Sequence, residues 1–227
     1  MKYRGYIQLG ILLLLIPLAG IIYCFLNKNN GQVHNLMTAL DRSIPFSSYF
    51  IVPYIAWYVL IFVVLIFFLR KDERLYYACV SSIILSLLIS YGVYYFYQTT
   101  VPRPVVIGHD VFSNLTRILY KVDNPYNTFP SIHVMTSYII FLASNKIKEY
   151  SSYKLTMAIK GSVVLVIVST LFLKQHTLLD VVGGLLLGGT LFSLSNWIIG
   201  SLDNTNNKVP GAKYGIIDIN SINTKHV

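Results

Sequence analysis

The sequence predicts an all-α, polytopic membrane protein with about six transmembrane helices packed in one bundle. Of its 227 residues, 55% are hydrophobic and only 12% are charged, whereas a typical soluble domain has about 25% charged residues. The mean hydropathy of the chain is +0.59. The apolar residues are also gathered into long blocks, close to the roughly 20 residues that a helix needs to cross a bilayer.

Each of six apolar blocks is predicted to form one membrane helix. The blocks cover approximately residues 6–26, 49–69, 75–97, 130–145, 157–173 and 177–199. The first block is too long for the apolar core of a signal peptide, and polar residues follow it instead of a small-residue cleavage site, so we expect a retained helix. A polar stretch over residues 98–128 separates the first three blocks from the last three.

The connections between the blocks carry their own signals. Segment 39–46 is predicted to be a short interfacial helix that connects the first two spans. The fourth block opens at Pro130, and because proline suits the first helical position, Thr128 or Phe129 is the expected cap. One membrane domain over residues 1–199 is therefore expected, followed by a polar cytoplasmic tail over residues 200–227.

Two glycine pairs in the sixth block predict a close helix contact. Gly183–Gly184 and Gly188–Gly189 follow one another at a spacing of five residues. Small residues at such positions allow a second helix to approach closely inside a membrane. We therefore expect the last helix to pack tightly against a neighbour.

The net charge of +9 is explained by membrane topology. If the N-terminus is cytoplasmic, twelve of the 18 Lys and Arg residues fall on the cytoplasmic side and six on the other. This is the positive-inside bias of membrane proteins. Both termini are therefore expected in the cytoplasm, and we expect no nucleic-acid partner.

The strongest chemical signal is the pair His176 and Asp180, at the junction of the last two blocks. Ionisable residues at membrane depth indicate function, because burying them is costly. The two residues are four apart, so they share one face of a helix. A carboxylate there can accept a hydrogen bond from one imidazole nitrogen and leave the other as a base or nucleophile. A purely structural pair is the alternative interpretation.

Two further polar features fall at the same predicted extracytoplasmic face. Ser131 and His133 lie where the fourth helix begins, and free N–H groups at a helix start bind anions. Arg103 lies between two prolines after the third block, and a guanidinium suits bidentate phosphate recognition. Two histidines, a carboxylate and an arginine at one surface are the groups that phosphoryl transfer through a histidine requires.

These residues resemble the three signature motifs of the type 2 phosphatidic acid phosphatase superfamily. The motifs are Arg103–Pro104, the run from Pro130 to His133, and Ser169 with His176 and Asp180. The resemblance covers roughly residues 40 to 190, and the stretches 123–133 and 169–176 are similar to the branch that includes inositol phosphorylceramide synthases. Departures from the usual motifs are Phe96 in place of lysine, Ile132 in place of glycine and Thr170 in place of arginine.

The resemblance implies a role for each residue of the site. His176 would attack the phosphorus, with Asp180 orienting the ring and stabilising the charged imidazole. His133 would protonate the leaving oxygen and then activate the acceptor. Neither a metal nor another cofactor is expected. The non-bridging phosphate oxygens would be held by Arg103, Ser131 and Lys174.

Three functions remain open from the sequence. The first is a lipid-phosphate phosphatase of the cell membrane, with water as the acceptor and lipid phosphates and membrane lipids as its partners. The second is a lipid phosphotransferase that uses the same site with an alcohol acceptor. The third is a non-catalytic binder or transporter of anionic lipids, which would tolerate loss of His176. A bacterial inner membrane is the expected location.

Overall fold

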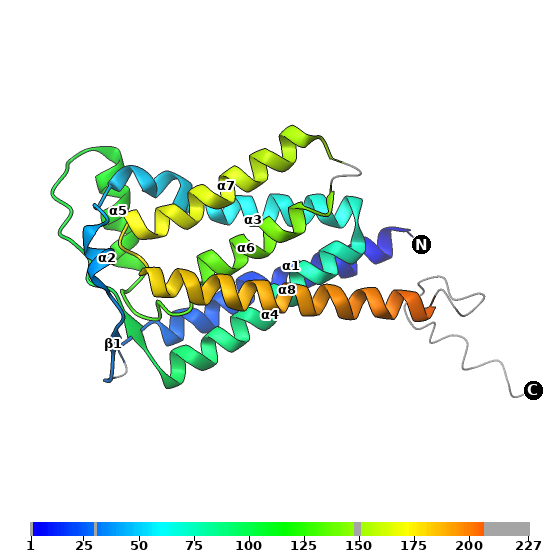
Figure 1. The fold of residues 1–227 in the computed structure, drawn as a ribbon, viewed down its shortest axis with the longest axis horizontal. Helices are drawn as coiled ribbons and strands as arrows, with labels where there is room; N and C mark the ends of the chain where they lie inside the picture. Colours follow the sequence, from blue (N-terminus) through cyan, green and yellow to red (C-terminus); the bar gives the residue numbers. More distant parts are fainter. Residues whose placement is uncertain (1, 30, 148–150, 207–227) are drawn as a thin grey trace, which may run out of the picture.

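The computed structural model describes residues 2–29, 31–147 and 151–206 and shows long helices running side by side (Figure 1). The elements in chain order are α1 (Lys2–Leu26), β1 (His34–Asn35), α2 (Ala39–Ser43), η1 (Ser48–Phe50), α3 (Ile51–Lys71), α4 (Glu73–Phe96), β2 (Thr99–Thr100), α5 (Val111–Val122), α6 (Ile132–Ser144), α7 (Tyr153–Phe172) and α8 (Leu178–Asn206). The all-α fold class is confirmed, because the two strands are short.

Four helical segments of the described chain are long and apolar enough to cross a membrane. They are Ser48–Lys71, Glu73–Phe96, Tyr153–Phe172 and Leu178–Leu202. Two further apolar helical segments, Leu13–Leu26 and Ile132–Ser144, are shorter than these four. The fold is therefore that of a membrane protein with at least four candidate spans, and the count of about six stays a prediction.

Helix α6 is shorter than its apolar block predicts. Its 13 residues rise about 20 Å, less than the roughly 30 Å of a bilayer core. The predicted cap at Thr128 or Phe129 is wrong: the helix begins at Ile132, and the Ser131 hydroxyl caps it by accepting a hydrogen bond from the Val134 N–H. Serine competes well for this position because its oxygen satisfies a free N–H group.

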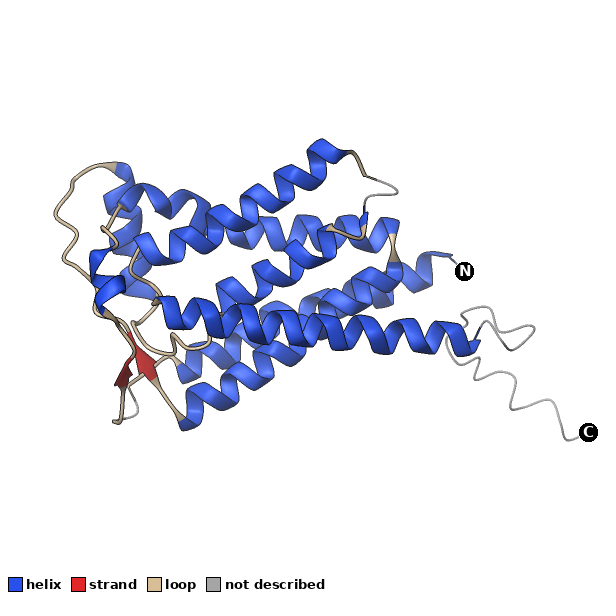
Figure 2. Ribbon diagram, in the orientation of Figure 1, coloured by secondary structure: helices blue, strands red, loops and turns tan. Residues whose placement is uncertain are grey.

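The short elements gather at one end of the bundle. Figure 2 shows the two strands at the end opposite the start of α1 and the last turns of α8. The strands pair in parallel, with His34 opposite Thr99 and Asn35 opposite Thr100. Helix α5 lies at the same end (Figure 1), inside stretch 98–128, for which the sequence predicts only a polar connection. Asp110 caps it through the N–H groups of the first turn.

The core of the bundle lies between α3, α4, α6, α7 and α8. Fully buried side chains include Phe68, Tyr76, Ile83, Met135 and Ile140. Helix α8 packs directly on α6 through its glycines. A Cβ atom at position 188 would lie 2.7 Å from the main-chain oxygen of Met135, and one at position 184 would lie 2.9 Å from that of Ser131. The predicted close helix contact is confirmed.

Helix α8 extends beyond its apolar block. It continues to Asn206, seven residues past the expected end at residue 199. The remainder of the predicted cytoplasmic tail, residues 207–227, lies outside the described residues.

Candidate active site

His176 lies in the short connection between α7 and α8, at the end of the bundle that carries the strands. The N–H groups of Gln175 and His176 both donate to the carbonyl oxygen of Thr170, at 2.9 and 3.2 Å. The Thr177 N–H donates to Asp180 Oδ2 at 2.7 Å, and the Thr177 hydroxyl accepts from the Asp180 N–H at 3.3 Å. This reciprocal pattern is a capping box, so hydrogen bonds to helix ends fix both sides of His176.

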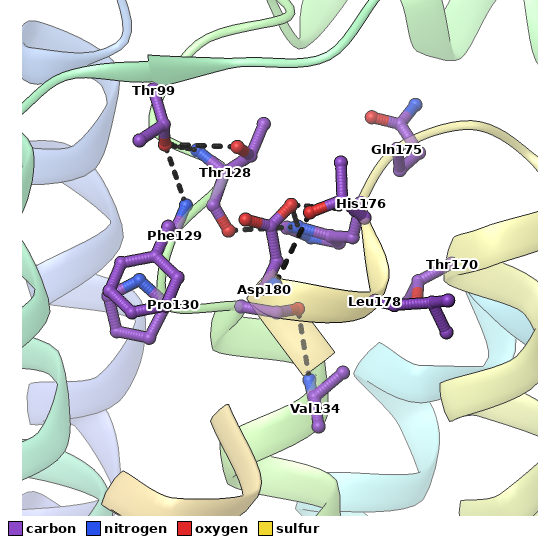
Figure 3. Close-up of polar contacts among 12 residues, drawn as sticks. Thr99, Thr128, Phe129, Pro130, Val134, Thr170, Gln175, His176, Leu178 and Asp180 are labelled. Atoms are coloured by element: carbon purple, nitrogen blue, oxygen red, sulfur yellow. Dashed lines mark hydrogen bonds and ion pairs between the residues drawn. The ribbon is translucent and has the colours of Figure 1, made fainter. Parts of the chain in front are cut away.

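The imidazole ring of His176 is oriented by a main-chain carbonyl. Its Nδ1 atom lies 3.0 Å from the carbonyl oxygen of Thr128 and 3.7 Å from Oδ2 of Asp180 (Figure 3). The spacing of the two residues predicts the carboxylate as the acceptor, but 3.7 Å is beyond a hydrogen bond, and Oδ2 already accepts from the Thr177 N–H. A carbonyl can only accept, so Nδ1 carries a proton, and in the neutral ring the free lone pair is on Nε2. Asp180 lies next to the ring as a carboxylate that is 0% exposed.

Thr99 of β2 fixes the segment that presents this carbonyl. Its hydroxyl oxygen accepts from the main-chain N–H groups of Thr128 and Phe129 at 3.0 and 2.8 Å and lies 3.0 Å from the Thr128 hydroxyl (Figure 3). The Asn127 N–H donates to the Thr99 carbonyl oxygen at 2.8 Å. The side chain of Thr99 is fully buried. Thr99 could not be found from the sequence, because no motif includes it.

His133 lies in the first turn of α6 and faces His176. The two ring centroids are 5.8 Å apart. Tyr54 and Trp57 of α3 pack against His133, with ring centroids at 4.4 and 4.3 Å. Its Nε2 atom has no hydrogen-bond partner among the described residues. The α6–α8 contact holds the two histidines at this separation, because the Ser131 N–H also donates to the Asp180 carbonyl oxygen at 3.1 Å.

Arg103 reaches the same place from the connection after β2. Its Nη1 atom donates to the carbonyl oxygen of Asp123 at 2.6 Å, and Nη2 donates to Oε1 of Gln175, the residue before His176. The guanidinium also lies over the ring of Tyr120, 4.6 Å from its centroid. Its Nε atom is buried and has no partner within the described chain. The Arg103 guanidinium is therefore held beside the loop that contains His176, and its Nε–H is available to a ligand.

Asp123 is a polar residue of the site that sequence reasoning did not single out. Its Oδ1 atom accepts from the Tyr23 hydroxyl at 3.0 Å and from Asn27 Nδ2 at 2.7 Å, and its Oδ2 atom lies 3.9 Å from Arg103. Burial raises the pKa of Asp123, and the charge of Arg103 opposes that increase. The sequence signal for Asp123 is its position at the start of stretch 123–133. No pattern there distinguishes a carboxylate of the site from an ordinary turn residue.

These groups open onto one cavity of about 410 Å³. Arg103, His133 and His176 line it, together with Asp123 and Gln175. Apolar and aromatic side chains form most of the remaining wall and come mainly from α1, α3 and α4, among them Ile16, Pro17, Ile61, Phe62, Leu87 and Tyr91. A largely apolar pocket with a few convergent polar groups is the usual form of a small-molecule site.

The two other predicted phosphate ligands lie outside this lining. The Ser131 hydroxyl is buried and accepts from the Val134 N–H at 3.3 Å. The ammonium of Lys174 donates to the carbonyl oxygens of Asp41 and Ile44, at 2.7 and 2.5 Å. Burial lowers the pKa of Lys174, and the charge of Asp41 acts against that decrease. Their role in binding phosphate therefore stays a prediction.

Within residues 2–29, 31–147 and 151–206, no group of three or more His, Cys, Asp or Glu side chains is arranged to hold a metal ion. The carboxylates near the histidines are Asp123, which pairs with Arg103, and Asp180, which caps α8. Ser169, the remaining residue of the third motif, bonds back to the Val166 carbonyl oxygen of its own helix at 2.6 Å.

Comparison with known proteins gives one match. Residues 31–194 match the family model of the PAP2 superfamily. This range includes Arg103, both histidines and Asp180. No curated protein and no solved structure showed a significant match.

Proposed function

Because this chain belongs to the PAP2 superfamily, whose members are typically phosphatases or phosphotransferases, we propose that it is a lipid-phosphate phosphatase acting through a phosphohistidine. One observation carries the proposal. Nδ1 of His176 is engaged by a carbonyl, which leaves Nε2 as a nucleophile, and the same ring lines a cavity with His133 and Arg103.

In the proposed reaction, Nε2 of His176 attacks the phosphorus and the bond from phosphorus to the lipid oxygen breaks. His133 gives that oxygen its proton and then takes one from water, which attacks the phosphohistidine and releases inorganic phosphate. The buried Asp180 carboxylate, 3.7 Å from Nδ1, stabilises the positive ring that forms. Arg103 neutralises charge on the non-bridging oxygens.

Ser131 and Lys174 are the two other phosphate ligands expected from the sequence, but the proposed reaction needs neither of them. Both side chains are bonded to main-chain groups in the structure, and neither lines the cavity. Arg103 does line the cavity, and its Nε has no partner within the described residues. It is the cation to which we assign the larger share of phosphate binding.

A lipid phosphotransferase is the second candidate. The resemblance of stretches 123–133 and 169–176 to inositol phosphorylceramide synthases supports it, as does the polar cluster of Asp123, Tyr23 and Asn27 beside Arg103. Carboxylate and amide oxygens accept hydrogen bonds from alcohol hydroxyls. An acceptor alcohol bound there would take the place of water in the second step.

We also propose an orientation in the membrane. The start of α1 and the last turns of α8 lie at the end of the bundle opposite the connection from α7 to α8 (Figure 1), which contains His176. With the Lys and Arg residues enriched on the side of the termini, this end is assigned to the cytoplasm and the site to the extracytoplasmic face. The proposed location is a bacterial inner membrane.

The test is phosphate release from a panel of lipid phosphates, with mass spectrometry of the lipid products. Wild type is compared with His176→Ala and with His109→Ala, a matched substitution at an exposed histidine before α5. Phosphate release that only His176→Ala abolishes supports the phosphatase. Transfer of a headgroup to an added alcohol, lost in the same variant, supports the transferase. Turnover that survives His176→Ala contradicts the phosphohistidine mechanism, and lipid binding without turnover in wild type supports the non-catalytic binder.

A further inference from the structure

Helix α2 is a five-residue segment held in shape by its own carboxylate. Oδ2 of Asp41 accepts from the N–H of Thr38 at 2.7 Å and from its hydroxyl at 2.6 Å, while the Asp41 N–H donates to that hydroxyl oxygen at 3.3 Å. This is a complete capping box. Asp41 is only 3% exposed, although an isolated cap on a short surface helix has no need to be buried.

The other oxygen of Asp41 leaves its own helix. Oδ1 accepts from the main-chain N–H of Leu178 at 2.7 Å. Leu178 is the first residue of α8 and follows His176 by two positions. A carboxylate that accepts from a free N–H at a helix start makes a strong, charge-assisted hydrogen bond. Asp41 thus joins α2 to the C-terminal side of the histidine loop.

A second tie runs in the opposite direction. Lys174 precedes His176 by two positions, and its ammonium donates to the carbonyl oxygens of Asp41 and Ile44 at the end of α2. The backbone of Lys174 has φ of +50°, a conformation that costs a non-glycine residue about 1 kcal/mol or more unless its surroundings hold it. The two carbonyl contacts supply such a hold. Residues 174 and 178 are therefore both fixed to α2, with His176 midway between them.

We propose that Asp41 and Lys174 are positioning residues that hold the His176 loop against α2, in a reaction for which neither needs to touch the substrate. The inference rests on the proposed function, since it concerns alignment of the nucleophile. The Thr128 carbonyl fixes the ring from one side, and α2 fixes the backbone from the other. Misplacement of a reacting group by about 1 Å can cost about 100-fold in rate.

The test compares Asp41→Ala, Lys174→Met and the double variant with Asp72→Ala. Asp72 also caps a helix, α4, through the Leu75 N–H at 2.9 Å, but α3 and α4 meet there at the other end of the bundle. Each single variant is expected to lower kcat about 10-fold or more with KM within about twofold of wild type. The double variant is expected to be no slower than the slower single one, because the loop needs both ends fixed.

The control Asp72→Ala is expected to lower thermal stability without lowering kcat. Asp41→Asn keeps an oxygen for the Leu178 N–H, so it should recover part of the lost rate. It also keeps the test informative if Asp41→Ala does not fold. An increase in KM for Lys174→Met, with multiplicative effects in the double variant, would show a phosphate ligand instead and overturn the proposal.

Hydrogen exchange of segment 173–178 gives a readout that is independent of turnover. Both single variants should exchange faster there than wild type, and Asp72→Ala should not. If wild type turns over no lipid phosphate, the proposed function fails while this measurement still tests the two ties. If exchange in segment 173–178 is the same in wild type and in both variants, the ties do not hold the loop.

Discussion

The carbonyl oxygen of Thr128 lies 3.0 Å from Nδ1 of His176. The group that selects the histidine tautomer is therefore part of the main chain, and no side-chain substitution removes it directly. Its position depends on Thr99, whose hydroxyl oxygen accepts from two successive N–H groups of the same segment. Thr99 is accordingly the place at which this hydrogen bond can be perturbed.

Thr99→Val is expected to lower kcat by about 10-fold or more, because it leaves two buried N–H groups unpaired and frees the carbonyl to shift. The free energy of unfolding should fall by about 1–3 kcal/mol. Steady-state kinetics and thermal unfolding measure the two effects. The matched control is Thr116→Val in α5, where the buried hydroxyl donates to the Phe112 carbonyl oxygen of its own helix. Equal loss of kcat in both variants would contradict the role of Thr99.

Asp180→Asn tests the charge of this residue separately from its hydrogen bond at the start of α8. The amide oxygen can still accept from the Thr177 N–H, so stability should change little, but the negative charge beside His176 is lost. We expect kcat to fall by at least about 100-fold, because the charged ring is no longer stabilised. Trapping of the phosphoenzyme in acid-quenched samples measures the first step. A phosphoenzyme that forms at the wild-type rate would disprove this role.

Gly188→Ala tests the α6–α8 contact. The new Cβ would lie 2.7 Å from the Met135 carbonyl oxygen, so the helices must separate, and we expect a loss of about 1–3 kcal/mol in the free energy of unfolding. Gly92→Ala in α4 is the control, because a Cβ there meets no atom within 4 Å. It should be neutral or stabilising by up to about 1 kcal/mol. Unfolding in detergent compares the two, and equal stability of both would refute the contact.

The pH dependence of stability should report on Asp41. Burial is the largest single influence and acts to raise its pKa, but hydrogen bonds from Thr38 and Leu178 and the charge of Lys174 together hold the pKa below its usual 3.8. The folded state thus favours the ionised form. Its stabilising contribution is complete above the unfolded pKa and is lost as pH falls through the lower folded value.

The unfolding temperature between pH 3 and 7 measures this contribution. Wild type should lose stability below about pH 4, and Asp41→Asn should start less stable and lose less on acidification. Asp123 acts with the opposite sign, because its raised pKa favours the protonated form, so its contribution is present at low pH and is lost as pH rises through the folded value. Comparing the two proteins cancels that effect. Parallel pH curves would contradict the assignment to Asp41.

The sequence predicted the helical fold and three of the residues that line the cavity, because both depend on patterns of few residue types. Apolar blocks marked α3, α4, α7 and α8, and the motifs marked Arg103, His133 and His176, which all line one cavity. Helix α5 was missed because it is amphipathic and short, although Asp110 before Val111 and Phe112 is a cap signal.

Other features of the site depend on contacts between distant segments, which spacing alone does not encode. The four-residue spacing of His176 and Asp180 suggests a direct hydrogen bond. Instead, Asp180 Oδ2 accepts from the Thr177 N–H, and Nδ1 of His176 bonds to the carbonyl oxygen of Thr128, 48 residues away. Lys174 is predicted to bind phosphate from its proximity to His176, and this stays a prediction; its ammonium contacts with the main-chain oxygens at positions 41 and 44 are not encoded in that spacing.

The apolar wall of the cavity has a practical consequence for any assay. Side chains such as Ile16, Phe62 and Leu87 line it, and the alkyl tail of a solubilising detergent matches them as well as an acyl chain does. Detergent in micelles therefore competes with the lipid substrate for this wall. Turnover of lipid phosphates should be faster in lipid nanodiscs than in long-tailed detergent. A failure to detect turnover in micelles would then reflect competition by the detergent and not the absence of a substrate.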